Sequence, residues 1–208
     1  MYLPAHFTES NPDQLEALIQ ENSFGVLVSV HEGLPVASHL PLLYDRHAGA
    51  HGRLIGHMAR SNSQWKSLAD GQTVLAVFQG PHAYISPSWY ESPGVPTWNY
   101  AVAHLYGKAA LVEERDALEG IVRRLTAFHE HGDREAGAPG VSSEMWSRLL
   151  GMIVGFEIEV TEIQGKFKLN QNRSREDQRR VVEALGRGGS QSATALARLM
   201  AANLEGAA

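Results

Sequence analysis

Residues 78–107, FQGPHAYISPSWYESPGVPTWNYAVAHLYG, hold two of the chain's four Trp and four of its six Tyr, with several prolines and almost no charge. A core strand favours apolar alternation and excludes proline from its middle. The density of aromatic rings beside Pro87, Pro93 and Pro96 therefore predicts the shaped wall of a pocket. Such a wall suits a flat, aromatic ligand.

The composition of the whole chain narrows the class of protein. At 208 residues the chain is long enough to bury a real core, and we expect one domain with a helical appendage. The formal net charge of -5 gives no general attraction to a phosphate backbone, which argues against a stand-alone nucleic-acid binder. Cys is absent, which excludes disulfides, thiolate nucleophiles, iron–sulfur clusters and Cys-ligated zinc.

Apolar segments long enough for a membrane or for secretion are not found. No secretory apolar segment opens the sequence, and the longest apolar runs, such as residues 74–78, are far too short to span a bilayer. We therefore expect a soluble, cytoplasmic protein without a membrane partner.

Secondary-structure patterns predict a sheet flanked by helices. Asn11 and Pro12 open an amphipathic helix, and Glu32-Gly33 joins the two strands of an antiparallel hairpin. Apolar residues at three- and four-residue steps predict a helix over 115–129 that packs on the sheet. The expected strands are 24–30, 34–43, 52–58, 72–79, 82–86, 98–112 and one through 156–160 that closes the sheet. Two shorter helices are expected, one after residue 61 and one over 142–150, and a loop over 132–140. Helices 176–185 and 192–204 are expected to form a helical hairpin.

The segment from His57 to Asn62 is the best candidate for an anion site. Arg60, Ser61 and Asn62 place a cation, a hydroxyl and an amide where a strand ends and a helix begins, and backbone N–H groups there favour a phosphate. Ser and Asn are also ordinary helix caps, so a capped helix with a solvated Arg60 is the alternative.

A second cationic cluster, KFKLNQNR at residues 166–173, follows the last predicted strand. Its amides suit a clamp on phosphate or on the polar edge of a ring, although a solvated loop has the same composition. Trp89, Tyr90, Trp98 and Tyr100 are candidates for stacking on a planar ligand, or they fill a barrel and a subunit interface. Asn99 lies between the last two, and a buried amide there needs hydrogen-bond partners that a heterocycle can supply.

The ten histidines do not form a strong metal motif. The densest group, His129, His131 and Asp133, lies at a predicted helix end where the dipole favours His, so we expect no metal. Four more histidines lie in separate predicted strands, and we expect each to be a hydrogen-bonded core residue: His39, His57, His82 and His104.

Other functional templates are absent or weak. The chain has no dinucleotide fingerprint, no P-loop, no nucleophile elbow and no H-E-x-x-H motif, so nothing indicates a nucleoside triphosphate or a hydrolase. Basic residues of the C-terminal helices alternate with acidic ones, which favours a solvated, salt-bridged face over a DNA-binding one: Arg175, Arg179, Arg180 and Arg187.

Six motifs in the same order resemble the PaiB family, described as FMN-binding negative transcriptional regulators. They are MYLP with Phe7, SHLP at 38–41, GHMARSN at 56–62, YISPSWY at 84–90, PTWNY at 96–100 and KFKLNQNR at 166–173. The resemblance covers residue 1 to about Arg180. It implies an α+β fold that is mainly β, an antiparallel split β-barrel of the FMN-binding type, with residues 1–173 as the FMN-binding domain and 174–208 as a C-terminal helical extension.

The resemblance also implies a cofactor and its contacts. FMN is the expected cofactor, bound between the subunits of a homodimer. Arg60, Ser61 and Asn62 would contact its phosphate, and Trp89 and Tyr90 would lie at the dimer interface. The other implied flavin contacts are Ser38, His39 and His57 from neighbouring strands, Trp98, Asn99 and Tyr100 around the ring, and Lys168, Gln171, Asn172 and Arg173 from the last segment.

Three functions stay open at this point. The first is a flavin-binding transcriptional regulator or redox sensor, and the second is an FMN-dependent oxidoreductase or flavin reductase acting on a small molecule. The third is a haem-binding split barrel, because histidines can serve as axial ligands. DNA binding follows only from the family's description, since neither the charge nor a helix-turn-helix motif predicts it. Catalytic residues are not predicted.

Overall fold

The computed structural model of the protein describes residues 1–69, 71–130 and 141–206. The chain divides into two compact units. Three strands contribute residues to both: β6 (Thr73–Ile85), β7 (Thr97–Val112) and β8 (Ile153–Lys168). Unit 1 consists of Met1–Glu21, Gln79–Ala103 and Gln164–Ala208, and unit 2 of Asn22–Phe78 and His104–Ile163. The strand order of the sheet is β3-β2-β6-β7-β8-β5-β4, and β1 pairs with β8.

Unit 2 begins with the predicted hairpin. β2 (Phe24–His31) pairs antiparallel with β3 (Leu34–Pro41), in a register that places Leu27 opposite Ser38. Glu32 and Gly33 both have positive φ angles, 50° and 81°, as the two-residue turn of a twisted hairpin requires. The chemistry of this turn therefore sets the register of the hairpin.

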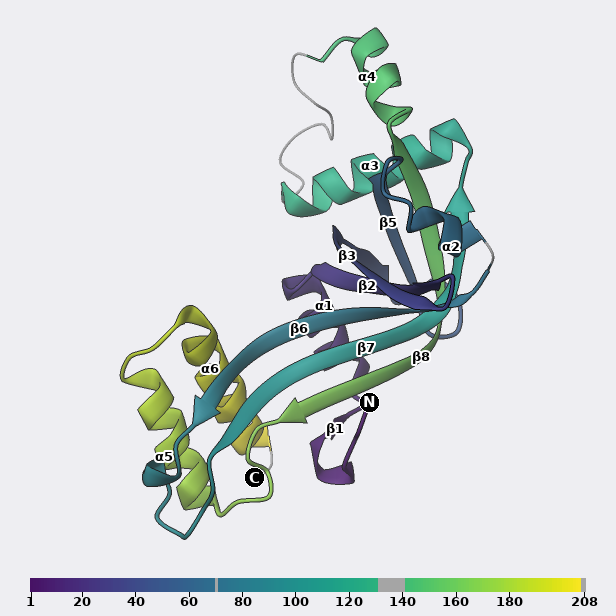
Figure 1. The fold of residues 1–208 in the computed structure, drawn as a ribbon. Helices are drawn as coiled ribbons and strands as arrows, with labels where there is room; N and C mark the ends of the chain where they lie inside the picture. Colours follow the sequence, from purple (N-terminus) through teal and green to yellow (C-terminus); the bar gives the residue numbers. More distant parts are fainter. Residues whose placement is uncertain (70, 131–140, 207–208) are drawn as a thin grey trace. The chain divides into compact units, whose positions relative to one another are not determined.

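A second set of strands completes unit 2. β4 (Leu43–Asp45) pairs with β5 (Arg53–Ala59), and β5 pairs with β8, all antiparallel. α3 (Arg115–His129) packs against β5 and buries Ile121 and Leu125 against Ile55 (Figure 1). Two shorter helices belong to the same unit, α2 (Trp65–Ala69) and α4 (Ser143–Leu150). These helices begin at or near the residues that the capping pattern indicated.

Unit 1 is built on the other ends of the long strands. α1 (Pro12–Glu21) starts where Asn11 Oδ1 accepts from the N–H groups of Asp13 (2.9 Å) and Gln14 (3.3 Å). It packs closely on the sheet, because a Cβ at Gly80 or Gly165 would collide with its leucine side chains. η1 (Ala5–Phe7) and β1 (Thr8–Glu9) precede α1, and η2 (Pro87–Trp89) lies between β6 and β7.

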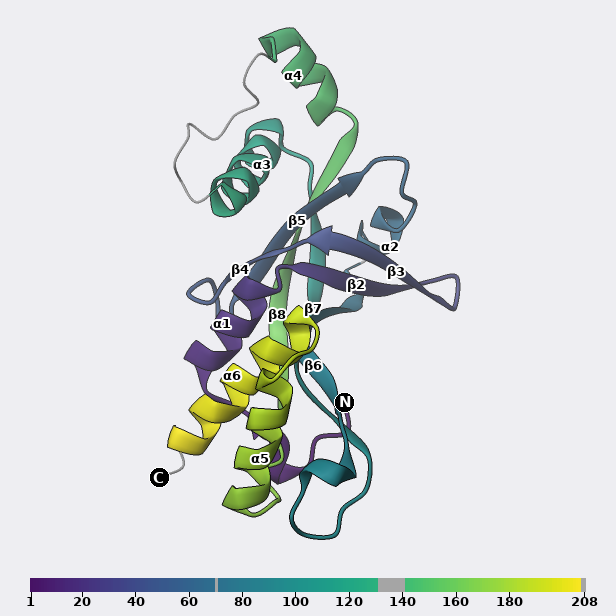
Figure 2. The ribbon, with the colours of Figure 1, turned by 90° about the vertical axis from the view of Figure 1, so that its left-hand side faces the viewer.

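The C-terminal helices also belong to unit 1. α5 (Arg175–Gly186) and α6 (Gln191–Gly206) lie side by side as the predicted helical hairpin (Figures 1 and 2). α6 packs on β6 and β7, since Ser192 Oγ accepts from the His82 N–H (2.8 Å) and Asn99 contacts Met200. In the part of the chain that the structure describes, no helix is both long and apolar enough to span a membrane.

Three secondary-structure predictions were wrong. β6 is one strand that continues through Gly80 and Pro81, because its pairing with β2 covers only residues 75–77, so the missing N–H of Pro81 costs no hydrogen bond to β2. β8 runs to Lys168, so residues 166–168 of the cationic cluster lie within this strand and not after it. β4 was not predicted, because three residues are too few for a visible period. The loop expected at 132–140 lies outside the described residues.

Candidate functional site

The turn after β5 carries the cation that the sequence indicated as an anion ligand. The guanidinium of Arg60 donates from Nε to the Gly151 carbonyl oxygen (3.1 Å) and from Nη2 to that of Ile153 (3.1 Å), and its backbone N–H donates to the Met152 carbonyl (2.8 Å). These bonds fix the side chain but do not neutralise it, because no carboxylate among the described residues pairs with Arg60. A fixed, exposed guanidinium is well suited to bind an anion.

Asn62 connects this turn to β3. Its Nδ2 donates to Ser38 Oγ (2.8 Å), and its Oδ1 accepts from the N–H of Gln64 (3.1 Å) at the start of the helical segment. Ser61 is exposed between Arg60 and Asn62. The structure thus brings together a cation, two hydroxyls and an amide from two separate segments of unit 2.

A buried amide holds this arrangement in place. Gln64 is 1% exposed, and its Nε2 lies within hydrogen-bond distance of the carbonyl oxygens of Leu27 (3.0 Å) and Val36 (3.1 Å) and of Ser29 Oγ (3.1 Å). Gln64 therefore ties the start of α2 to both strands of the hairpin, and so positions Asn62 beside Ser38. This role of Gln64 was not predicted, because no local pattern shows which distant carbonyls a glutamine reaches.

Two half-buried histidines of unit 2 each have an unsatisfied ring nitrogen. The Nδ1 atoms of His57 and His104 are buried without a hydrogen-bond partner among the described residues, so the prediction of hydrogen-bonded core histidines was wrong for both. Burial lowers the pKa of both imidazoles, which keeps them neutral near pH 7. His39 is exposed on β3, with its ring 6.3 Å from that of Phe24. No group that could hold a metal occurs among the described residues, and residues 131 and 133 of the suspected cluster lie outside them.

In unit 1, two lysines lie two residues apart on β8. Lys166 is 7% exposed; its Nζ donates to the Tyr2 carbonyl oxygen (3.0 Å) and lies 5.3 Å from the Tyr2 ring and 5.5 Å from the Tyr100 ring. Lys168 Nζ donates to the Trp98 carbonyl (2.7 Å) and to the Thr97 hydroxyl. No carboxylate among the described residues pairs with either ammonium group. Burial lowers the pKa of Lys168, and the charge of Lys166 lowers it further.

Exposed aromatic rings lie next to this lysine pair. Trp98 is 53% exposed, and its ring centroid is 6.1 Å from Tyr84, which is 46% exposed, and 6.4 Å from His82. Asn99 has the opposite orientation, as alternation along a strand requires. It is fully buried, its Nδ2 contacts Met200 Sδ (3.5 Å), and its Oδ1 has no partner in the described chain. Trp98 and Tyr100 therefore share a face that Asn99 does not reach.

The segment after β8 holds the loop before β7. Asn170 Nδ2 donates to the Tyr90 hydroxyl (3.2 Å), and Arg173 donates to the Pro93 carbonyl (3.0 Å) with its guanidinium 4.5 Å from the Tyr90 ring centroid. Gln171 folds back on the strand end, where its Nε2 donates to the Phe167 carbonyl oxygen (2.6 Å). Asn172 is exposed. Tyr90 is buried inside unit 1, so it does not offer the exposed surface that its predicted place at the dimer interface requires.

Asp177 completes this attachment from α5. Its carboxylate is fully buried and accepts from the Ser92 hydroxyl and from the N–H groups of Glu91 (2.8 Å) and Ser92 (3.3 Å). The Ser92 hydroxyl bond, followed by these N–H bonds, lowers the pKa of Asp177 despite its burial. The alternation of charges in the C-terminal helices predicted a solvated, salt-bridged face, which is wrong for the buried Asp177. Two Arg–Glu pairs do form as expected, Arg179–Glu176 within α5 (3.6 Å) and Arg187–Glu183 at its C-terminal end (3.2 Å).

Comparison with known proteins gives the family. Residues 1–162 match the family model described as "Putative FMN-binding domain". The chain belongs to this FMN-binding domain family. It is 40% identical over 200 residues to "Protease synthase and sporulation protein PAI 2" of Bacillus subtilis, covering 96% of both chains, which confirms the resemblance to PaiB. It is also 29% identical over 241 residues to "Uncharacterized protein AN0679" of Emericella nidulans, again covering 96% of each.

Solved structures support the fold of this FMN-binding domain family member. The FAD and heme binding protein from Mycobacterium smegmatis superposes with a TM-score of 0.62 at 16% identity, covering 88% of this chain and 80% of that one. The flavocytochrome Anf3 from Azotobacter vinelandii gives a TM-score of 0.61 at 14% identity, covering 77% and 69%. At these identities the likeness concerns the fold alone, and it confirms the predicted α+β, mainly antiparallel, flavin-binding split-barrel class.

The predicted contacts divide between the two units. Unit 2 contains Ser38, His39, His57 and the turn 60–62, and unit 1 contains Trp98, Asn99, Tyr100 and the segment 168–173. The first group offers a fixed cation with hydroxyls, and the second offers exposed rings with uncompensated ammonium groups. Taken separately, the first set suits a phosphate and the second a planar, polar ring, the two kinds of group that FMN contains. The expected cofactor agrees with the description of the family.

Proposed function

We propose that the protein binds FMN as a homodimer and acts as a flavin-binding regulator or redox sensor. The observation that carries this proposal is the turn after β5, where Arg60 is fixed by carbonyls, exposed and free of any carboxylate within the described chain. Ser61, Asn62 and Ser38 lie around it and complete a set of donors for a phosphate.

The ring end of the cofactor is assigned to unit 1. Trp98 and Tyr100 offer aromatic faces, and Lys168 offers a cation to the polar edge of the isoalloxazine. Gln171, Asn172 and Arg173 follow on the same segment. Asn99 is the least suited of the predicted contacts, because its amide faces α6. His39 and His57 would contact the flavin from β3 and β5, with the neutral imidazole of His57 acting as a hydrogen-bond acceptor.

When bound, FMN would supply hydride and electron transfer, while the protein binds and tunes it. The exposed Trp98 and Tyr84 support the homodimer part of the proposal, because neighbouring aromatic side chains that are exposed together favour an interface. Sedimentation equilibrium measures the oligomeric state directly. A monomer at micromolar concentration contradicts this part alone and leaves FMN binding to be judged by its own titration.

The test of FMN binding is the visible spectrum of the purified protein, followed by titration of the apoprotein with FMN. We expect Arg60→Ala to weaken FMN binding by roughly 10–100-fold, since a hydrogen bond to a charged group contributes about 1.5–3 kcal/mol. The control is Arg124→Ala, which removes another exposed arginine of unit 2 that pairs with Asp45. Equal affinities of both variants and the wild type would sink the phosphate assignment, and a Soret band in place of a flavin spectrum would favour haem.

The competing enzymatic function is an FMN-dependent oxidoreductase. Anaerobic addition of NADH or NADPH to the flavin-loaded protein separates the two, because bleaching of the flavin needs a path for hydride transfer. A regulator that senses occupancy does not bleach under these conditions. Gel-shift titration over a range of salt concentrations tests direct DNA binding, which we expect to be weak and salt-sensitive for a chain of net charge -5.

A further inference from the structure

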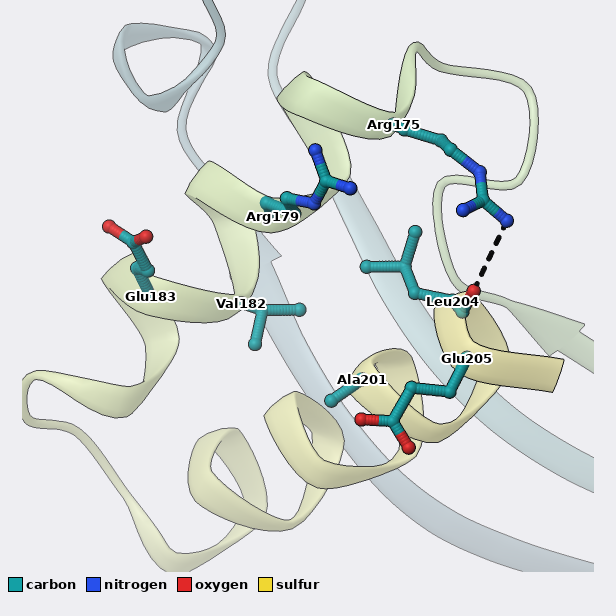
Figure 3. A pocket seen from close by; sticks show the side chains of 7 residues that line it. All are labelled: Arg175, Arg179, Val182, Glu183, Ala201, Leu204 and Glu205. Atoms are coloured by element: carbon teal, nitrogen blue, oxygen red, sulfur yellow. Dashed lines mark hydrogen bonds between the residues drawn. The ribbon is translucent and has the colours of Figure 1, made fainter. Parts of the chain in front are cut away.

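The helical hairpin contains a cavity that the proposed flavin site does not use. A cavity of about 400 Å³ opens between α5 and α6 (Figure 3). Its apolar part consists of Val182, Ala201 and Leu204, which are half-buried side chains of the two helices. None of its lining residues belongs to the predicted flavin contacts. Both helices lie within unit 1, so the cavity is formed inside one compact unit.

Charged groups of opposite sign surround this apolar part. Arg175 and Arg179 line the cavity from α5, and the Arg175 guanidinium donates to the Leu204 carbonyl oxygen (3.3 Å; Figure 3). Arg179 is exposed and has only a loose pair with Glu176 at 3.6 Å. A guanidinium in this state can exchange its partner for a carboxylate of a ligand.

Glu205 provides the opposite charge from the last turn of α6. No cation among the described residues pairs with its carboxylate. It lies where the helix dipole is negative, so a carboxylate there is disfavoured until a cation binds beside it. The other acidic lining residue, Glu183, already pairs with Arg187 at 3.2 Å. Glu205 is therefore the carboxylate of the cavity that has most to gain from an ammonium group.

We propose that this cavity binds a small zwitterion with an apolar side chain, an α-amino acid of the leucine type. Its carboxylate would bind Arg179 and Arg175, its ammonium group Glu205, and its side chain would contact Val182 and Leu204. A simple anion would pair with the arginines but not with Glu205, and a simple hydrocarbon would pair with none of the charged side chains of the cavity. The helices that form the cavity cover the face of β7 opposite to Trp98 and Tyr100, because Met200, next to Ala201, contacts Asn99.

Isothermal titration with L-leucine tests this assignment on the full-length chain, with and without FMN. We expect saturable binding, and affinity at least tenfold lower for three compounds that each lack one group: glycine, 4-methylpentanoate and 3-methylbutylamine. Arg179→Gln and Glu205→Gln are each expected to weaken L-leucine binding at least tenfold. The matched control is Arg180→Gln, which changes the neighbouring exposed arginine outside the cavity and leaves binding unchanged.

Several outcomes overturn the proposal. No saturable heat with L-leucine up to about 10 mM, a range that corresponds to less than roughly 3 kcal/mol of binding, excludes the site. Equal binding of glycine excludes the apolar contact, and unchanged binding in both variants places any leucine site elsewhere. Circular dichroism melting of each variant excludes unfolding as the cause of a loss. FMN affinity is measured separately, so failure of the flavin site does not affect the result.

Discussion

The turn after β5 and the exposed face of β7 and β8 both offer cations without carboxylate partners among the described residues, but they hold them differently. Arg60 is fixed by three bonds to the 151–153 backbone and cannot lose its charge near neutral pH. Lys168 is half-buried beside a second lysine, and its pKa is lowered. The first region suits permanent binding of a dianionic phosphate. In the second region, the positive charge of Lys168 is lost at a lower pH than that of an ordinary lysine, and it therefore suits a ligand whose own charge changes.

The largest expected effect concerns the attachment of the loop that carries Tyr90. Asp177→Asn removes a buried charge that accepts three hydrogen bonds, and we expect a loss of roughly 2–3 kcal/mol in the free energy of unfolding. Urea denaturation measures it. In the wild type, the stabilisation by the Asp177 carboxylate should also be lost as the pH falls below 3.8. The reason is that its pKa is lower in the folded chain, so the unfolded chain binds the proton first. The neighbouring, exposed Glu176→Gln serves as the control, and equal losses in both variants contradict the role of Asp177.

Alkaline titration of FMN affinity separates the two cationic regions. Lys168 loses its proton earlier than an ordinary lysine, so FMN binding should weaken as the pH rises through its lowered pKa. Lys168→Met should weaken binding by roughly tenfold at neutral pH, the effect of losing one charge-assisted hydrogen bond. Lys168→Arg should retain affinity and lose this alkaline step, since guanidinium stays protonated. An identical alkaline profile in wild type and Lys168→Arg would remove Lys168 from the ring end.

The preorganisation of the phosphate turn predicts a smaller effect. Asn62→Ala removes both the link to Ser38 Oγ and the cap on Gln64, and we expect a stability loss of about 1 kcal/mol, typical of a helix cap. FMN affinity should fall by more than this loss explains, because Arg60 and Ser61 are on the same turn. Thermal unfolding and fluorescence titration of the same preparation measure both. Full FMN affinity in a destabilised variant would show that Asn62 is only a cap.

The smallest effect concerns His57. Its folded-state pKa lies below 6.5 because of burial, so the unfolded chain binds more protons as the pH falls through 6.5 and stability declines. His57→Gln should therefore flatten the decline in the free energy of unfolding between pH 7 and 5. His47→Gln, at an exposed histidine of the same unit, is the matched control. Parallel pH profiles for wild type and His57→Gln would contradict burial of the uncharged ring.

Much of the fold follows from local sequence signals. The Asn11 cap, the Glu32-Gly33 turn and the apolar steps of residues 115–129 each act within a few residues, and the structure has the predicted elements there. The continuity of strand β6 could not be predicted from local signals. Proline disfavours a strand only where a neighbour needs its N–H, and the extent of the pairing with β2 is a property of the sheet.

The candidate flavin contacts show the same difference between local sequence signals and long-range packing. Residue types and spacing in the sequence located Arg60, Trp98 and Lys168, because charge and ring size belong to the residues themselves. Their identification as flavin contacts came from motif resemblance and stays a prediction. The direction of Asn99 toward α6 and the burial of Asp177 depend on which helix covers which face of the sheet. That packing is set by long-range contacts of α5 and α6, so residue types alone do not specify it.

The sequence by itself determined the family, the α+β class and the residue types that suit a phosphate and a planar ring, because these depend on composition, local periodicity and motif order. Only the tertiary structure decided that Arg60 is fixed by backbone carbonyls, that two lysines share a face with Trp98, and that Asp177 is buried. The physical reason is distance along the chain. Hydrogen bonds between residues 60 and 151, or 92 and 177, depend on how remote segments pack, and no local pattern encodes them.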